Sequence, residues 1–393
     1  MCFHHDDLPT ELWLEIFSHL DIRSYFVSHE PFQPIPGVSS EAGNTSGSSY
    51  HAVVLVCRNW RAWAIQLQFR NIKLSEELSQ LMHEATRIHG EWVRRAVVPY
   101  STTVTATSKP MLSTGILGNC HKLEVLVRPP YQATPLRHLK FEFDATCPPL
   151  PSLKRLDFWN HIEASRSGGI NSLTAVLAAA PNLEYLFIGG GVSGTFFGLV
   201  KSSIHLPRLR TLRLNIANAL LLRDVLYRWT LPELDNLVVD SPVPGMPGME
   251  MSMVWETLGP QLRIVEFGRH LRFLLHQTLS PCLRGCPNLV CVNFYVFITM
   301  PPEMDQEEVF PSVTSIGIHL LDNPFLGGDT ASWEQLERHF DAFTGPMFPG
   351  LQRVRVFGPR QSILGDARFA VLSHRLNERG CALEFPDGRP FLN

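Results

Sequence analysis

Lysine is scarce in this chain of 393 residues: only six of the 34 basic residues are lysine, and the others are arginine. Charged residues of both signs make up 18% of the chain, whereas they make up about a quarter of a typical soluble domain. The formal net charge is −3. A general nucleic-acid binder carries a basic excess, so this charge balance argues against nucleic acid as a partner.

Signals for membranes and export are also lacking. No apolar run approaches the ~18 residues that a membrane-spanning helix needs. The opening residues, MCFHHDDLPTELW, have no basic segment followed by an apolar one, as a secretory signal would. The eight cysteines are too sparse for a disulfide framework and fit a reducing compartment. We therefore expect no membrane partner and a soluble protein of the cytoplasm, the nucleus or both.

Two segments near the N-terminus have helical periodicity. In the first, apolar residues recur every four positions, with Trp13 and Phe17 beside them: Leu8, Leu12, Ile16 and Leu20. Pro9 falls in the first turn, which tolerates proline. The second segment resumes at Ala52 as one helix, with these residues on one face: Val53, Val56, Cys57, Trp60, Ala64 and Leu67. Between them, residues 28–51 are rich in Ser, Pro and Gly without Lys or Arg, which predicts a disordered insertion.

Together the segments LPTELWLEIFSHLD and VCRNWRAWAIQLQFRNIKL resemble an F-box, the small helical module that docks on the Skp adaptor of a cullin-RING ubiquitin ligase. The resemblance covers Leu8 to Leu74, and the insertion departs from the family's short connection. It implies these adaptor contacts: Leu8, Pro9, Leu12, Ile16, Phe17, Leu20, Val56, Cys57 and Trp60. Trp60 also suits the module's own core. Periodicity alone allows a plainer interpretation, a helical hairpin whose apolar faces pack on the rest of this protein.

Helical spacing continues from Ser75 to Val98, with an apolar side formed by Leu78, Leu81, Met82, Ala85, Ile88 and Trp92. This pattern predicts a connecting helix. We therefore expect three parts: an F-box module over residues 1–74, a connecting helix and linker over residues 75–110, and a repeat array over residues 111–393.

The remaining chain repeats the pattern Pro-x-Leu-x-x-Leu-x-Leu. The leading apolar residues are Leu153, Leu183, Leu209, Leu234, Leu262, Leu289, Val313 and Leu351, with weaker copies at Leu123 and Leu136. Their period of about 26 residues falls in the leucine-rich range, in which each repeat supplies one strand and one helix. Amphipathic segments such as LTAVLAAA and WEQLERHFDAF lie between the repeats. The predicted fold class is α/β: a small all-helical F-box module followed by a leucine-rich-repeat solenoid.

Alternation along each repeat strand predicts which side chains point to the concave side. Leu183, Leu186 and Ile188 would face the core. The candidate target-binding residues on the other face are Arg155, Asp157, Glu184, Tyr185, Arg210, Arg213, Asp235, Arg263, Glu266, Arg353 and Arg355. Their mixed signs suit a protein target better than a phosphate backbone. Taken singly, each of them is better explained as an ordinary solvated strand residue.

Two motifs have other interpretations. Residues 189–194 read GGGVSG, a G-x-G-x-x-G pattern, but the next strand ends in Asn215 where a dinucleotide site needs an acidic residue. Cys282, Cys286 and Cys291 near His276 lack paired C-x2-C spacing, which favours buried thiols over zinc. We therefore predict no catalytic residue, no cofactor and no metal.

The resemblance implies a substrate-recognition subunit of an SCF-type ubiquitin ligase, bound to an Skp-family adaptor and through it to cullin and RING subunits. The repeats would bind an unknown protein target. A non-degradative F-box scaffold is the alternative, and an α/β enzyme is a more distant one. Few lysines in a ligase receptor would leave few sites for ubiquitin on the receptor itself, although an arginine-rich codon bias explains the same composition.

Overall fold

The structure is a computed structural model, and it describes residues 8–18, 29–37, 53–75, 77–103, 113–131, 138–140, 146–160, 168–190, 203–216, 219–241, 249–270, 272–275, 279–303, 308–323, 329–358 and 361–391. The statements below concern these residues.

A parallel sheet of twelve strands forms the body of the protein, and neighbouring strands follow one another in chain order. Its strands are β1 (Asn71–Lys73), β2 (Arg95–Val97), β4 (Val125–Arg128), β6 (Arg155–Asn160), β7 (Tyr185–Gly190), β9 (Thr211–Ile216), β11 (Asn236–Ser241), β12 (Ile264–Phe267), β13 (Cys291–Tyr295), β14 (Ser315–His319), β15 (Arg353–Phe357) and β16 (Ala382–Glu384). Two small pairs lie apart from it: β3 (Ser101–Thr103) with β5 (His138–Lys140), and β8 (Ile204–His205) with β10 (Trp229–Thr230).

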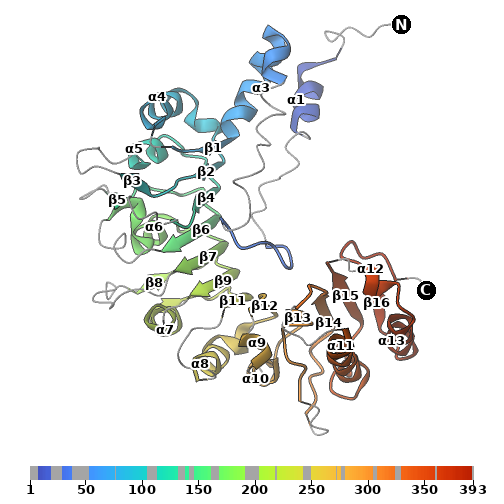
Figure 1. Cartoon of the computed structure of the whole chain (residues 1–393). Coiled ribbons are helices and arrows are strands. Elements are labelled where there is room, and N and C mark those ends of the chain that lie inside the picture. Colours follow the sequence, from blue (N-terminus) through green and yellow to red (C-terminus); the bar gives the residue numbers. More distant parts are fainter. Residues whose placement is uncertain are drawn as a thin grey trace, which may run out of the picture.

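Helices connect successive strands along the outer side of this curved sheet (Figure 1). They are α4 (Ser79–His89), α5 (Ser113–Gly118), α6 (Leu173–Ala179), α7 (Ala219–Arg228), α8 (Met249–Leu258), α9 (Arg272–Leu275), α10 (Leu279–Gly285), α11 (Asp329–Thr344), α12 (Gln361–Leu364) and α13 (Ala367–Glu378), with short 3-10 turns at η2 (Gly90–Trp92), η4 (Gly169–Asn171) and η5 (Gly259–Gln261). Two further helices, α1 (Thr10–Ser18) and α3 (Arg58–Arg70), stand together beyond the first strand. Every helix in the described part of the chain is too short or too polar to cross a membrane.

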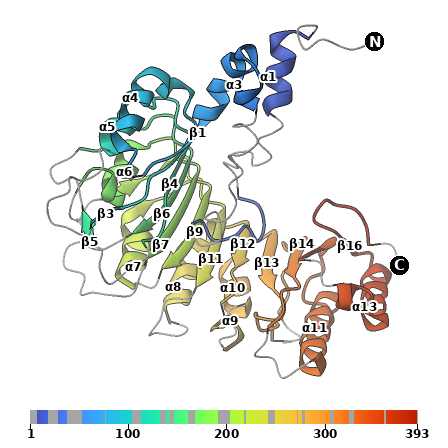
Figure 2. The ribbon, with the colours of Figure 1, turned by 45° about the horizontal axis from the view of Figure 1, so that its top comes forward.

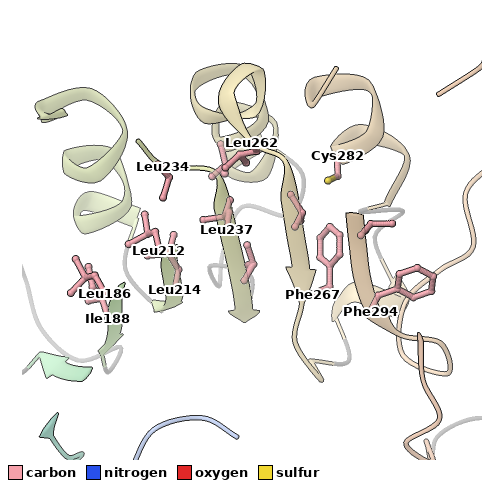
Figure 3. Close-up of a cluster of buried hydrophobic side chains, with 14 of the residues drawn as sticks. Leu186, Ile188, Leu212, Leu214, Leu234, Leu237, Leu262, Phe267, Cys282 and Phe294 are labelled. Carbon is pink, nitrogen blue, oxygen red and sulfur yellow. The ribbon is translucent and has the colours of Figure 1, made fainter. Parts of the chain in front are cut away.

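The leading apolar residue of each repeat begins the turn into its strand. The N–H of Leu183 donates to the carbonyl of Ala180, and the N–H of Leu262 donates to the carbonyl of Gly259. All eight leading residues are buried. Leu186 and Ile188 on β7 join them in a continuous core between sheet and helices, shown in Figure 3 for the middle of the array. A single strand-helix unit cannot cover its own apolar face, so the units stack.

The predicted connecting helix over residues 75–98 is wrong in extent and role. Helix α4 covers only Ser79–His89, and the following residues form strand β2, which pairs with β1 and β4. Three residues of the apolar side are exposed: Leu78, Leu81 and Ile88. Because β1 begins at Asn71, the sheet starts within the segment predicted as the F-box module. In residues 95–97, pairing with two neighbouring strands outweighs the helical spacing of the sequence.

Candidate functional site

Helices α1 and α3 form a hairpin with a small aromatic interior. The ring of Trp60 lies 4.7 Å from the ring of Trp13 and 5.1 Å from that of Phe17, between centroids. Phe17 is 1% exposed and packs with Val53 and Ala64. Such contacts bury large rings and add edge-to-face attraction. The hairpin therefore closes its own interior without using the outer face of α1.

That outer face is apolar and uncovered. Leu8, Leu12 and Ile16 are 38%, 48% and 45% exposed, and Pro9 is exposed beside them. Leu55 and Val56 in the helical turn 53–56 are also exposed. A cluster of large exposed apolar side chains on one module is typical of a surface that a partner covers. This set, Leu8, Pro9, Leu12, Ile16, Leu55 and Val56, is called the outer apolar face below.

The second helical segment is interrupted at Cys57, so the single helix predicted from Ala52 is wrong. Cys57 has extended backbone angles, φ −158° and ψ 172°, and its Sγ accepts the N–H of Trp60 at 3.4 Å. The thiol thus caps α3, since the first N–H groups of a helix lack partners within it. The break turns Val56 outward while Val53 stays inside.

The predicted adaptor contacts therefore divide. Leu8, Pro9, Leu12, Ile16 and Val56 lie on the outer apolar face. The prediction that Phe17 contacts the adaptor is wrong, because Phe17 is buried inside the hairpin. Trp60 is half-buried in the same interior, as expected for a residue of the module's own core. Leu20 lies outside the described residues.

The other candidate surface is the concave face, the side of the sheet opposite the helices. The strand register aligns one row of side chains across it: Val127, Asp157, Phe187, Arg213, Val238, Glu266, Asn293, Gly317, Arg355 and Glu384. Phe187 and Val238 stand outside the main core cluster although both are buried. Something other than the helices must therefore cover this row.

Charged groups near the middle of the row form buried ion pairs. The guanidinium of Arg213 makes two hydrogen bonds of 2.8 Å to the carboxylate of Asp240. Burial lowers the pKa of Arg213, but Asp240's hydrogen bonds and charge raise it above its ordinary value overall. Arg155 Nε lies 3.2 Å from both carboxylate oxygens of Asp157, and its guanidinium covers the Tyr185 ring at 4.1 Å. Charged groups near the middle of the row are thus paired through charge-assisted hydrogen bonds.

The cover is a segment from within the predicted insertion, residues 29–37, called the strap below. Figures 1 and 2 show it in blue, crossing the concave side of the sheet. His29 Nε2 lies 3.2 Å from Oε2 of Glu266. Arg213 Nη1 donates to the carbonyl of Pro34 at 3.3 Å, and Trp159 Nε1 donates to that of Pro36 at 2.7 Å. The disorder predicted for residues 28–51 is therefore wrong for the strap, while the rest of that insertion lies outside the described residues.

Because the strap covers part of the concave face, several residues that were predicted to be exposed there are buried. Five of the predicted target-binding residues are almost completely buried: Arg155, Asp157, Tyr185, Arg213 and Glu266. The other six remain partly or fully exposed: Glu184, Arg210, Asp235, Arg263, Arg353 and Arg355. Of these, Glu184 pairs with Lys154 at 3.9 Å and Arg210 with Glu233 at 3.7 Å. Such exposed pairs contribute little stability.

Sequence reasoning missed an aromatic cluster on the concave face. Tyr295, His319 and Phe357 align across β13, β14 and β15, and each follows its repeat's leading residue by six positions. The ring of Phe32 packs on all three, at centroid distances of 5.1, 5.1 and 4.8 Å. An aromatic residue at the same position of three successive repeats was the signal that could have identified this cluster.

The two further motifs are part of the fold. Gly189 lies in β7, where an added Cβ would come within 2.5 Å of the Trp159 ring, so close packing accounts for this glycine. The segment expected to follow it as a helix lies outside the described residues. Cys282 and Cys286 are buried, and burial raises the pKa of the Cys282 thiol. Within the described ranges, His, Cys, Asp and Glu side chains nowhere gather in a group of three that could hold a metal ion.

Comparison with known proteins identifies the N-terminal module. The family model of the F-box domain matches residues 6–28. The second half of the resemblance, with Val56, Cys57 and Trp60, lies beyond the matched residues. No curated protein matches the chain significantly. The chain therefore contains an F-box domain, and its remaining residues are interpreted from their structure.

Proposed function

Starting from the F-box domain at residues 6–28, we propose that this protein is a target-recognition subunit of an SCF-type ubiquitin ligase. Its outer apolar face docks on an Skp-family adaptor, and its concave face binds a protein target. The observation that carries the first part is the exposure of Leu12 and Ile16 on a hairpin whose own interior is already filled. Exposed apolar anchors on a helix are what a partner's hydrophobic surface recognises.

The repeat array is the target-binding part of this proposal. Its period, its strand-helix units and its parallel sheet in chain order support a leucine-rich-repeat solenoid. Such arrays present a long curved surface for partners. Phe187 on β7 and Arg213 on the adjacent β9 lie on that surface, and Glu266 lies two strands further along it on β12, so the surface combines apolar and charged groups. This combination suits a protein segment.

In this role the chain acts by proximity and performs no bond-making step of its own. F-box proteins generally act as receptors and adaptors. Holding a target beside a ubiquitin-loaded carrier makes an intermolecular transfer effectively intramolecular, which raises its rate. Cullin and RING subunits would join through the adaptor, in the cytoplasm or the nucleus, where F-box proteins are typically found.

The adaptor interface is tested with Leu12→Asp combined with Ile16→Asp in the full chain. Interface anchors contribute about 2 kcal/mol or more each, so we expect adaptor affinity to fall at least ~100-fold in a pull-down titration. Val371→Asp on α13 is the matched control, since Val371 is 60% exposed and lies at the far end of the array. Equal adaptor recovery by all three proteins would contradict the proposal.

The proteins that co-purify with the adaptor distinguish a non-degradative scaffold from a ligase receptor. A receptor brings cullin into the purified complex and loses it in the Leu12→Asp, Ile16→Asp variant. Adaptor without cullin in the wild-type complex would favour the scaffold.

A further inference from the structure

We propose that the concave face is a binding site for a proline-containing peptide with a phenylalanine anchor, and that the strap occupies this site in cis as an autoinhibitory segment that a target must displace. The proposal deepens the proposed function by describing the target segment, and it rests on that function only in calling the displacing peptide a target.

The first observation is that the strap is held as a ligand would be held. Phe32 inserts its ring among Tyr295, His319 and Phe357 from three successive strands. The carbonyls of Pro34 and Pro36 accept hydrogen bonds from array side chains. An aromatic anchor in an apolar cluster, combined with hydrogen bonds to the carbonyls of the bound segment, is what a peptide-binding surface provides.

The second observation concerns Glu266, whose carboxylate is 2% exposed. Asp157 and Asp240 on the same face each pair with an arginine of the array. Glu266 has no guanidinium partner among the described residues, and its hydrogen bonds come from His29 and the N–H of Phe32. A buried carboxylate is costly without such partners. The array therefore presents an acceptor that needs a peptide's donors.

The third observation is that the strap fits this surface at a conformational cost. Phe32 has φ +60°, and it is the one non-glycine residue with positive φ in the described chain. It follows Pro31 in a turn in which the N–H of Gln33 donates to the carbonyl of Glu30 at 3.1 Å. Turns with proline in second place and positive φ in third normally place glycine there. The contacts of the Phe32 side chain therefore outweigh a backbone preference of about 1–2 kcal/mol.

The fourth observation is that the strap leaves polar groups of the site unpaired. The hydroxyl of Tyr185 and Oδ1 of Asn236 are buried without a hydrogen-bond partner in the described structure. Burial raises the pKa of the Tyr185 hydroxyl, so it remains a donor. Each unsatisfied buried group costs roughly 1–3 kcal/mol. A target with an acceptor for Tyr185 and an unstrained aromatic anchor would bind better, residue for residue, than the strap.

The strap's advantage is that it belongs to the same chain. A segment of the same chain binds intramolecularly, so it competes at a high effective concentration. A modest intrinsic affinity is then sufficient to keep the site covered in the absence of a target. The strap also lies between α1 and α3 in the sequence, so its displacement would release residues 29–37 between these two helices.

The test uses a fluorescent peptide with the strap's sequence, HEPFQPIPG, titrated by anisotropy into the full chain. Phe32→Ala in the protein removes the anchor in cis and leaves the aromatic cluster unchanged. We expect this variant to bind the peptide at least ~10-fold more tightly than the wild type does. The peptide HEPAQPIPG should bind neither protein. Glu30→Ala is the matched control, because the Glu30 side chain is exposed within the same strap.

A second variant releases the strap without touching its anchor. Gly37 has φ +74°, and an added Cβ would lie 2.6 Å from Cδ of Pro130, so Gly37→Val should displace that end of the strap. It should also bind the peptide more tightly than the wild type does. A cooperative melt of each variant verifies its fold.

Equal peptide binding by the wild type and both release variants, or no binding by either folded variant, would overturn the proposal and leave the strap as a fixed structural tie. The assay contains no adaptor, so its failure is distinguishable from failure of the proposed function. The Leu12→Asp, Ile16→Asp variant, which should lose adaptor binding, should bind the peptide as the wild type does.

Discussion

The backbone N–H of Phe32 donates a hydrogen bond to Oε2 of Glu266 at 3.1 Å, joining residues 234 positions apart in the chain. In sequence Phe32 lies between α1 and α3, whereas Glu266 lies in β12, the eighth strand of the sheet. The bond therefore attaches the strap, which lies between α1 and α3 in sequence, to the middle of the concave face. The predictions below begin with this attachment.

Removing the carboxylate should loosen the strap. In Glu266→Ala, His29 and the Phe32 N–H lose their acceptor, so we expect amide exchange across residues 29–37 to accelerate at least ~10-fold by mass spectrometry, since local opening controls exchange. Glu184→Ala is the matched control, because Glu184 is partly exposed and pairs with the exposed Lys154. Unchanged exchange in Glu266→Ala would show that other contacts hold the strap.

Breaking the buried pair of Arg213 and Asp240 should lower the free energy of unfolding more than replacing both residues with apolar ones. Asp240→Ala leaves a buried guanidinium without its carboxylate, so we expect a loss of about 3–5 kcal/mol in the free energy of unfolding by urea titration. The double replacement Arg213→Met, Asp240→Leu should lose less than the single one. Glu84→Ala removes an exposed pair with Arg87 and should change stability by less than ~0.5 kcal/mol. If Asp240→Ala were as stable as the double variant or more stable, this account would be wrong.

Stability should fall as the solution is acidified because of His339. Burial lowers the pKa of His339 from 6.5 to about 4, while its Nε2 lies 3.0 Å from the carbonyl oxygen of Thr299. Between those pH values the unfolded chain binds a proton that the folded chain excludes. The contribution of His339 to the free energy of unfolding is therefore complete above pH 6.5, and it decreases as the pH falls toward 4.

For His339 alone, we expect a loss of about 2 kcal/mol between pH 7.5 and pH 5, from the shift of its pKa. Urea titrations of the wild type and of His339→Gln at both pH values measure it, because other titrating groups cancel in the difference. Equal losses in the two proteins would show that His339 takes up its proton without unfolding.

Two residues of the hairpin, Trp60 and Leu55, should separate folding from docking. Trp60 fills the hairpin interior against Trp13 and Phe17, so Trp60→Ala should cost about 3–5 kcal/mol of the hairpin's stability, measured as faster proteolysis. Leu55 is 82% exposed, so Leu55→Ala should leave proteolysis unchanged and weaken adaptor binding. If Leu55→Ala destabilised the hairpin, the outer apolar face would be part of its interior instead.

Much of the architecture follows from local pattern. The repeat of leading leucines defined the array because a buried turn and strand must recur wherever each unit stacks on the next, and residues such as Leu183 and Leu262 occupy the predicted positions. The apolar stripe through Leu12 and Ile16 predicted an amphipathic helix for the same reason. These features depend on spacing within one segment, which a sequence displays directly.

Other features depend on which distant segments meet. Helical spacing over residues 75–98 could not show that Arg95–Val97 pairs with β1 and β4. Composition predicted disorder for the strap, since a polar, proline-rich segment has too little apolar surface to order itself. Phe32 is ordered because three aromatic residues from separate repeats surround it.

The sequence by itself thus determined the repeat period, the orientation of the strand residues and the F-box signature, all of which depend on short-range periodicity. Only the tertiary structure decided that Arg213 and Glu266 are buried and that residues 29–37 cover them. The physical reason is that burial and partner choice on the concave face depend on contacts across hundreds of residues, whose energies are absent from any local pattern.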